Sequence, residues 1–277
     1  MLLFSACEVI NPQEEIPSYI HIEKIDLKIT DTNTQGSASH NITDAWVFVD
    51  DELIGAFELP KTIPILKAGN HTLKVRAGIK NSGATLLRTT YPFFNSYVND
   101  TTFTLFRDSV ITITPVVTYN TDDFTWIEDF EDPAISIIEL SNTDTILEST
   151  QDAAKVFEGT ASGVIYLDSA HPIYRGATND AYNLPKGGKE VYLELDYKTS
   201  TLLVVGLIAN NPTNVNEEPV IFIFPTDDWN KIYIDLSQQV SIETDALSYR
   251  ISFTADISND SEPSAEIYLD NLKLIHK

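Results

Sequence analysis

One segment of the sequence, residues 166–185, gathers side chains of the types that recognise sugars. Aromatic rings can take the apolar face of a pyranose, and polar side chains can read its hydroxyls. The candidate glycan-binding residues here are Tyr166, His171, Tyr174, Arg175 and Tyr182. We expect them on a loop between strands, because binding residues usually sit on loops held by a rigid scaffold. The alternative is that the tyrosines pack into the edge of the fold and that Arg175 pairs with one of the many acids.

The motifs of common catalytic sites are absent from the sequence. It contains no HExxH zinc motif, no GxSxG nucleophile elbow, no P-loop and no dinucleotide-binding fingerprint. The five histidines are scattered along the chain. Carboxylates are plentiful, but a general acid and a nucleophile must lie at a defined separation, which one sequence does not reveal. We therefore predict that the protein is not an enzyme and has no catalytic residues.

The composition excludes several classes of protein. The 277 residues include 18 Lys and Arg against 41 Asp and Glu, and the resulting net charge of −23 repels nucleic-acid phosphates. Hydrophobic residues make up 43% of the chain, which is enough for folded cores. The single cysteine excludes an intramolecular disulfide. No apolar run reaches the ~18 residues of a membrane-spanning helix. We predict a folded protein with no nucleic-acid partner.

Short strand patterns follow one another along the whole chain, without a long segment of helical period. Asp50 and Asp51 predict a hairpin turn, a shift at Glu23–Lys24 suggests a bulge, and the apolar run 220–224 predicts a central strand. We assign the three tryptophans, Trp46, Trp126 and Trp229, to core or edge packing. Turn residues cluster near 118–124 and mark a boundary. The fold class is therefore all-β, with two β-sandwich domains over residues 18–120 and 125–277.

Leu3-Phe4-Ser5-Ala6-Cys7 resembles the lipobox of bacterial lipoproteins. The resemblance implies that Cys7 is the lipid attachment site, whereas the alternative is a short apolar strand with a buried thiol. Only six residues precede Cys7, which is too few for a complete signal. We therefore expect residues 1–7 to be a truncated lipoprotein signal and residues 8–17 to be an acidic tether. The acidic stretch resembles that of surface lipoproteins of Bacteroidota, which implies a surface-exposed outer-membrane lipoprotein of the cell envelope.

Residues 44–76 resemble PEGA-type and related immunoglobulin-like modules of bacterial envelope proteins. The matching residues are Val47, Val49, Asp50, Gly55, Pro60, Pro64, Gly69, His71, Thr72 and Leu73. The PEGA tetrapeptide itself is missing. The resemblance implies an immunoglobulin-like sandwich over residues 18–120 that serves as a spacer or adhesion unit.

Residues 125–277 resemble the jelly-roll, galactose-binding-like sandwiches of carbohydrate-binding modules. The match lies in three places: residues 129–132, Trp229 with residues 232–237, and residues 267–272. In that family the first and last strands pair and often hold a structural calcium. Carried over, this implies Asp129, Glu131 and Asp270 as its ligands, since calcium prefers carboxylate oxygens. The alternative is that Asp270 and Asn271 only end or bulge the last strand. No other cofactor is implied.

Two hypotheses follow for the function. The first is a non-catalytic, lipid-anchored cell-envelope protein that binds glycan through the C-terminal jelly roll. The alternative is an accessory or structural subunit of an outer-membrane transport or secretion complex. The expected partners are accordingly a glycan, the outer membrane through the N-terminal lipid, and an outer-membrane protein complex.

Overall fold

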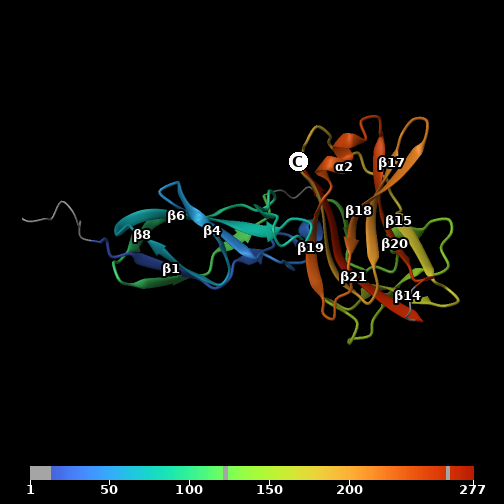
Figure 1. The fold of residues 1–277 in the computed structure, drawn as a ribbon, viewed down its shortest axis with the longest axis horizontal. Helices are drawn as coiled ribbons and strands as arrows, with labels where there is room; N and C mark the ends of the chain where they lie inside the picture. Colours follow the sequence, from blue (N-terminus) through green and yellow to red (C-terminus); the bar gives the residue numbers. More distant parts are fainter. Residues whose placement is uncertain (1–13, 121–123, 260–262) are drawn as a thin grey trace, which may run out of the picture. The chain divides into compact units, whose positions relative to one another are not determined.

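The computed structural model describes residues 14–120, 124–259 and 263–277, apart from the side chains of residues 100–102. Strands make up 54% of the chain and helices 4%, which confirms the all-β prediction. The chain divides into two compact units, each of which is built from packed sheets (Figure 1).

Unit 1 contains the described residues up to Asp26, together with Ile42–Gly78 and Asn95–Val117. One of its sheets has the order β5-β1-β9, and the other places β3 between β4 and β6, with β8 on the far side of β6. Buried aliphatic side chains such as Ile20, Val47 and Val75 form its core. The strands in this part of the chain are β1 (Ser18–Ile22), β2 (Asp26–Lys28), β3 (Asp44–Val49), β4 (Glu52–Glu58), β5 (Lys61–Ile65), β6 (Gly69–Lys80), β8 (Tyr97–Leu105), β9 (Val110–Ile113) and β10 (Val116–Thr118).

The hairpin predicted at Asp50 and Asp51 is confirmed between β3 and β4. Both residues have positive φ angles, 53° and 61°, which aspartate tolerates better than most residues do. The Asp50 carboxylate accepts hydrogen bonds from the Thr72 amide (3.0 Å) and from His71 Nδ1 (2.7 Å), and these bonds lower its pKa to about 2. At Glu23–Lys24 the structure has a break between β1 and β2.

Unit 2 contains residues 27–41, 79–94 and 118–277. It therefore differs from the predicted domain ranges of 18–120 and 125–277, because two segments expected in the first domain pack on the second. Tyr91 carries much of this packing: its ring lies edge-on to Tyr192, with the two centroids 5.3 Å apart, and its hydroxyl donates to Glu194 at 2.7 Å. Local strand patterns do not encode such contacts between residues about 100 positions apart.

Two antiparallel sheets form the sandwich of unit 2. The β21 sheet has the order β13-β14-β21-β16-β19, with β11 also paired to β21, and the β20 sheet has the order β12-β15-β20-β17-β18. The strand β7 (Arg88–Thr90) lies outside both of these sheets. The strands of the two sheets are β11 (Phe124–Glu128), β12 (Ile137–Glu139), β13 (Leu147–Thr150), β14 (Ser162–Asp168), β15 (Ile173–Thr178), β16 (Val191–Thr199), β17 (Leu203–Asn210), β18 (Val215–Ile223), β19 (Asn230–Asp235), β20 (Ser248–Asp256) and β21 (Ser264–His276).

The expected pairing of the first and last strands of the second domain is confirmed, since β11 lies antiparallel to β21. The alternation in β16 is also confirmed, because Leu193 and Leu195 belong to the core between the sheets while Glu194 and Asp196 face outward. The prediction of a central strand over residues 220–224 is wrong. Residues 220–223 belong to β18, which is the edge of the β20 sheet, and Pro219 is compatible with an edge because it donates no backbone hydrogen bond.

The helices in the described part of the chain are short: α1 (Thr32–Gln35) has four residues and α2 (Ser237–Ile242) has six. Within the described ranges, no helix is long and apolar enough to cross a membrane.

Candidate functional site

The predicted sugar-binding segment consists mostly of two strands, β14 and β15, rather than of a loop. Strand β14 ends at Asp168 and β15 begins at Ile173, so only a short turn separates them. The two strands belong to different sheets of unit 2 (Figure 1). The candidates therefore do not form one cluster: Tyr166 lies on the outer face of the β21 sheet, and Arg175 lies on the outer face of the β20 sheet.

Tyr174 is a correction to the candidate set. Its side chain is 1% exposed and belongs to the core between the sheets. Gly176 leaves room for it, since a Cβ at that position would lie 2.1 Å from the tyrosine oxygen. Burial raises the pKa of Tyr174, and its hydroxyl has no hydrogen-bond partner among the described residues. The ring is not available to stack on a sugar.

His171 and Tyr182 have local structural contacts. His171 lies in the turn between β14 and β15, where its Nδ1 is 3.1 Å from Asp168 Oδ1. Tyr182 packs beside Trp126, with the two ring centroids 6.4 Å apart, and its backbone pairs with Tyr249. Burial raises the pKa of Tyr182 to about 12. Neither residue lies beside Arg175 on the outer face of the β20 sheet.

A groove runs across the outer face of the β20 sheet, and we call it the β20 groove. It has a volume of about 280 Å³. Its floor follows one register row of small side chains, in which Gly206 pairs with Ser252 and Ser252 pairs with Ala177. A Cβ on Gly206 would lie 2.6 Å from Ser252 Oγ and 3.0 Å from the Glu218 carbonyl oxygen. Glycine is therefore what allows the strands to lie this close. The lining residues are Arg175, Val204, Gly206, Glu217, Glu218, Pro219, Ser252 and Thr254.

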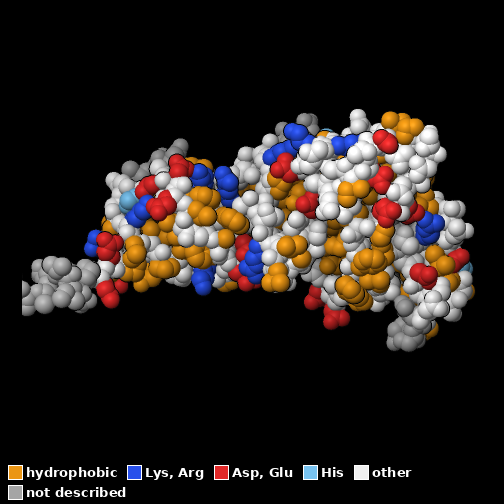
Figure 2. Space-filling view, turned by 45° about the horizontal axis from the view of Figure 1, so that its top comes forward, with side chains coloured by type: hydrophobic (Ala, Val, Ile, Leu, Met, Phe, Trp, Pro, Cys, Tyr) orange, Lys and Arg blue, Asp and Glu red, His pale blue; other side chains and the backbone are white. Residues whose placement is uncertain are grey.

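One register row beside the floor carries an aromatic ring at one end and a guanidinium at the other. Phe222 pairs with Val204, Val204 with Thr254, and Thr254 with Arg175, so these residues cross four adjacent strands. With strands ~4.8 Å apart, the row is about 14 Å long. Phe222 is 53% exposed at the edge of the sheet. Figure 2 shows such hydrophobic side chains in patches on the surface, interspersed with acidic ones.

Charged groups lie across the small floor from each other. Arg175 donates from Nη2 to Glu217 Oε2 at 2.5 Å and from Nη1 to the Ser141 carbonyl at 3.0 Å. Arg250 lies on the row beyond the floor, opposite Ile208, and donates from Nε to the Thr178 carbonyl. Its Nη2 is buried without an acceptor among the described residues. The groove therefore offers one apolar surface and several fixed groups that can read hydroxyls.

The three predicted calcium ligands line one depression of unit 2. Asp129, Glu131 and Asp270 surround a volume of about 210 Å³, together with Glu158 and Asn271. Their oxygens, however, accept hydrogen bonds from the protein. Glu131 accepts from the amides of residues 160 and 161 and from a threonine hydroxyl, which together lower its pKa. In the parts of the chain that the structure describes, no group of three or more His, Cys, Asp or Glu side chains is arranged to hold a metal. As they stand, these carboxylates do not fit a calcium ion.

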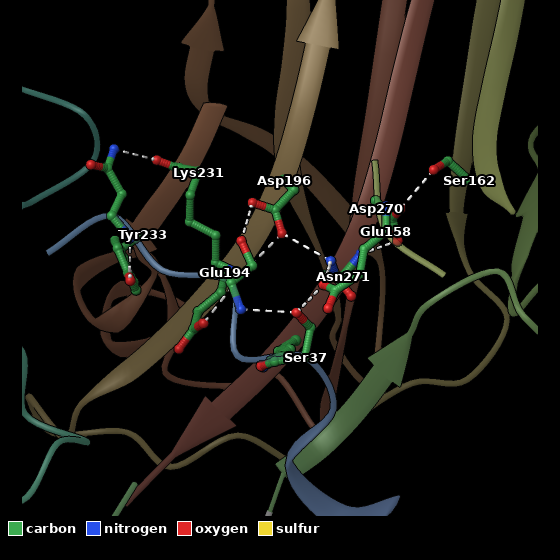
Figure 3. A network of polar contacts seen from close by, with 12 residues as sticks. Ser37, Glu158, Ser162, Glu194, Asp196, Lys231, Tyr233, Asp270 and Asn271 are labelled. Carbon is green, nitrogen blue, oxygen red and sulfur yellow. Dashed lines mark hydrogen bonds and ion pairs between the residues drawn. The ribbon is translucent and has the colours of Figure 1, made fainter. Parts of the chain in front are cut away.

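Next to this depression, a buried network of charged side chains covers part of the outer face of the β21 sheet (Figure 3). Lys231 Nζ lies 3.6 Å from Glu194 Oε2 and 3.5 Å from Asp196 Oδ2. Asn271 Nδ2 donates to Asp196 at 3.1 Å and to Glu158 at 3.2 Å. Burial raises the pKa of Asp196, and each of its oxygens has a donor.

The network is a structural feature rather than an open site. Segments 27–41 and 79–94 lie over it and contribute Ser39, whose hydroxyl donates to Asp196 at 2.7 Å, and Tyr91. Burial raises the pKa of Asp270 to about 7 and lowers that of Lys273 to about 8. Shifted pKa values indicate a functional site when the groups line a cleft. Here most of the groups are enclosed and paired, so the network attaches the two segments to the sheet.

Sequence reasoning did not identify Glu217 as a residue of a groove, nor Phe222 as an exposed ring beside it. Two signals in the sequence point to it. Gly206 interrupts the apolar run 203–209, and an isolated glycine in a strand marks a close approach of backbones. Pro219 indicates an edge strand, and an apolar residue of an edge strand that points away from the core, such as Phe222, is exposed.

No family model and no curated protein matches the chain. Several solved structures are similar to it. One was determined to explain the promiscuous specificity of carbohydrate-binding modules of the β-sandwich superfamily (15% identity, 84% of each chain covered, TM-score 0.40). Another is the family 11 carbohydrate-binding module from Clostridium thermocellum in complex with a β-1,3-1,4-mixed-linked tetrasaccharide (13% identity, 54% of this chain and 94% of that chain, TM-score 0.38). A third is a family 29 carbohydrate-binding module (14%, 55% and 88%, TM-score 0.35). Likeness at this level does not identify a ligand for this chain.

Proposed function

We propose that this protein is a non-catalytic glycan-binding protein of the cell envelope that holds sugar in the β20 groove. The observation that carries the proposal is the row from Phe222 to Arg175 beside a floor of small residues. A pyranose can stack on the exposed ring while its hydroxyls bond to groups along the groove. The floor leaves room for it, because Gly206 and Ala177 contribute little volume.

The ion pair of Arg175 and Glu217 provides the polar half of this recognition. Both side chains are partly exposed, so a ligand hydroxyl can reach them without displacing the backbone. Hydrogen bonds to charged groups are stronger than neutral ones and have fixed directions. The pair therefore favours ligands with several hydroxyls at defined positions, as sugars have.

A glycan array followed by titration calorimetry tests the proposal. Phe222→Ala should weaken the binding of the best glycan at least about tenfold, which corresponds to about 1.4 kcal/mol. Arg175→Ala removes the cation of the polar half of the site and should abolish detectable binding in the groove. Phe106→Ala is the matched control, because it removes an equally exposed ring from unit 1 and should leave binding unchanged. Failure of the wild-type protein to bind any glycan would refute the function, whereas binding that neither groove variant alters would refute the site.

We also propose that Cys7 carries a lipid that anchors the protein in the outer membrane with its domains exposed at the surface. Cys7 lies outside the described residues, so the support is the motif at residues 3–7 alone. Cys7→Ser in the native gene should abolish incorporation of radiolabelled palmitate and move the protein out of the membrane fraction. Ser5→Gly keeps a small residue and should retain the label. A labelled serine variant would exclude this anchor.

The alternative function, an accessory subunit of an outer-membrane complex, is favoured by one observation. Leu86 and Leu87 are 94% and 60% exposed in the segment between β6 and β7, where an adjacent apolar pair suits a protein contact. Copurification with a membrane protein in mild detergent, lost in Leu86→Asp but kept in Thr85→Asp, would support it. Identical copurification of both variants would exclude this pair as the contact.

A further inference from the structure

The outer face of the β21 sheet carries a second group of aromatic side chains, which we call the aromatic strip: Phe157, Trp229, Tyr268 and Tyr166. The centroids of Phe157 and Trp229 are 5.1 Å apart, and those of Trp229 and Tyr268 are 6.2 Å apart. Phe157 is 38% exposed and Tyr166 is 37% exposed. Three chain segments that are distant in sequence therefore meet in one partly exposed aromatic surface.

Lys155 links the two tyrosines of the strip. Its Nζ lies 4.8 Å from the ring centroid of Tyr166 and 5.6 Å from that of Tyr268. The same nitrogen is 3.2 Å from Glu266 Oε1. These contacts hold a cation and an acid in place on the strip, where each can bond to a hydroxyl that approaches the rings.

Beside the strip lies a depression of about 360 Å³, lined mostly by residues with polar side-chain groups. This volume falls in the range of about 300–1,000 Å³ that is typical of small-molecule sites. The hydroxyl of Thr226 is buried in its wall without a hydrogen-bond partner among the described residues. Such a group gains a bond when a polar ligand arrives. The lining residues are Lys198, Thr199, Ser200, Pro225, Thr226, Asp227, Glu266 and Tyr268.

The strip lies on the part of this face that the buried network leaves open. Along β21, Tyr268 precedes Asp270, where the enclosed charges begin. Segments 27–41 and 79–94 bond to this face at Asp196 and Glu194, whereas among the described residues no hydrogen bond, ion pair or ring contact joins either segment to a side chain of the strip. The whole arrangement belongs to unit 2.

From this geometry we infer a second saccharide-binding site on the aromatic strip, independent of the β20 groove. Trp229 and Phe157 provide the stacking surface, and Lys198, Glu266 and Thr226 read hydroxyls in the depression. Cations and acids are balanced here, as Lys155 and Lys198 stand against Glu266 and Asp227, so the favoured ligand is a neutral saccharide rather than a uronate. The inference rests on the proposed function for its class of ligand, and it adds a second binding site at a different place on the protein.

The two sites lie on opposite outer faces of one sandwich, because the strip is on the β21 sheet and the groove is on the β20 sheet. The core of unit 2 separates them. A single straight oligosaccharide cannot occupy both, so each site takes a different glycan chain. The protein then links two polysaccharide chains, which one site cannot do.

Titration calorimetry of the full chain with soluble hexasaccharides of mixed-linkage β-glucan, xylan, β-1,4-galactan and galacturonan tests the inference. A neutral hexasaccharide should bind with two molecules per chain, and Trp229→Ala should reduce this to one. Arg175→Ala should also reduce binding to one molecule per chain, and the molecule that remains, at the strip, should quench the fluorescence of Trp229. Trp229→Phe keeps a stacking ring and should retain both events, and Phe157→Ala is a second variant in case the tryptophan change disturbs the fold.

Each outcome distinguishes the two proposals. One molecule per chain, lost in Arg175→Ala and unaffected by Trp229→Ala and Phe157→Ala, overturns the second site and keeps the proposed function. One molecule, lost only in the strip variants, keeps the strip and overturns the groove. Preference for galacturonan at the strip overturns the neutral ligand class. Absence of binding to all four hexasaccharides and on the array overturns both proposals.

Discussion

Replacing Lys231 by methionine should strongly destabilise unit 2. The Lys231 side chain is 2% exposed and its ammonium lies 3.5–3.6 Å from the carboxylates of Asp196 and Glu194, which are 1% and 0% exposed. Methionine has a similar volume, so the main effect is electrostatic. Removing one partner of a buried ion pair costs about 3–5 kcal/mol, because the other charge remains buried without compensation.

The loss should depend on pH through Asp196. Burial raises the pKa of this carboxyl, and the charge of Lys231 opposes the rise. Without Lys231 the folded-state pKa of Asp196 lies further above its unfolded value, so the variant regains stability as the pH falls. The destabilisation should therefore be smaller at pH 5.5 than at pH 7.5.

Urea titration followed by tryptophan fluorescence measures this effect, since unit 2 contains Trp126 and Trp229. Lys189→Met is the matched control: Lys189 is exposed just before β16, and its variant should differ from wild type by less than about 0.5 kcal/mol. Adding Glu194→Gln to Lys231→Met should recover part of the loss. A loss below about 1 kcal/mol at pH 7.5, or one that does not vary with pH, would refute the role of charge pairing in this network.

Three further predictions concern the same unit. Burial raises the pKa of Asp270 to about 7, so this carboxyl stabilises the fold at low pH, and up to about 4 kcal/mol of that stability is lost as the pH rises from about 4 to 7. Asp270→Asn should remove this pH dependence of the urea midpoint between pH 5 and pH 8, and an unchanged dependence would assign it to another group. EDTA should leave the melting temperature unchanged, because the carboxylates of Asp129, Glu131 and Asp270 do not fit calcium. A melting temperature that falls by several degrees in EDTA and recovers when calcium is added would contradict that conclusion. Tyr174→Phe should raise the unfolding free energy by about 1 kcal/mol without altering glycan binding, since it removes a buried hydroxyl that has no partner among the described residues; a loss of stability in denaturant titration would show that the hydroxyl is satisfied.

Local patterns were sufficient for the strands and for features that depend on neighbouring residues. The alternation in β16 and the aspartate turn after β3 follow from side-chain period and from backbone preference, which act within a few residues. Segments 79–94 and 27–41 were assigned to the first domain because their apolar patterns look like those of any other strand. Their place in unit 2 depends on contacts between residues about 100 positions apart, such as Tyr91 with Glu194, and a short stretch of sequence does not contain both partners.

The candidate site could be predicted in part. Arg175 was expected on a loop but lies on strand β15, and Tyr174 beside it is buried, because adjacent residues of a strand point to opposite faces. The sequence does not show which of the two faces outward, since Tyr174 could occupy the core only where Gly176 leaves a space. The residue types were therefore informative, whereas the face of the sheet to which each side chain points depended on the register of β15 with β20.

Chain segments cover part of the outer face of the β21 sheet, and a ligand can bind only where they do not. Polar residues on the outer face of the β21 sheet would look like a binding surface from their types alone, yet those near Asp196 are enclosed by chain segments and satisfied by them. Polar residues in the β20 groove and beside the aromatic strip line open depressions instead, and Arg175 and Glu217 in the groove remain partly exposed. This open lining favours the groove and the strip over the charged network as the surfaces that recognise a ligand.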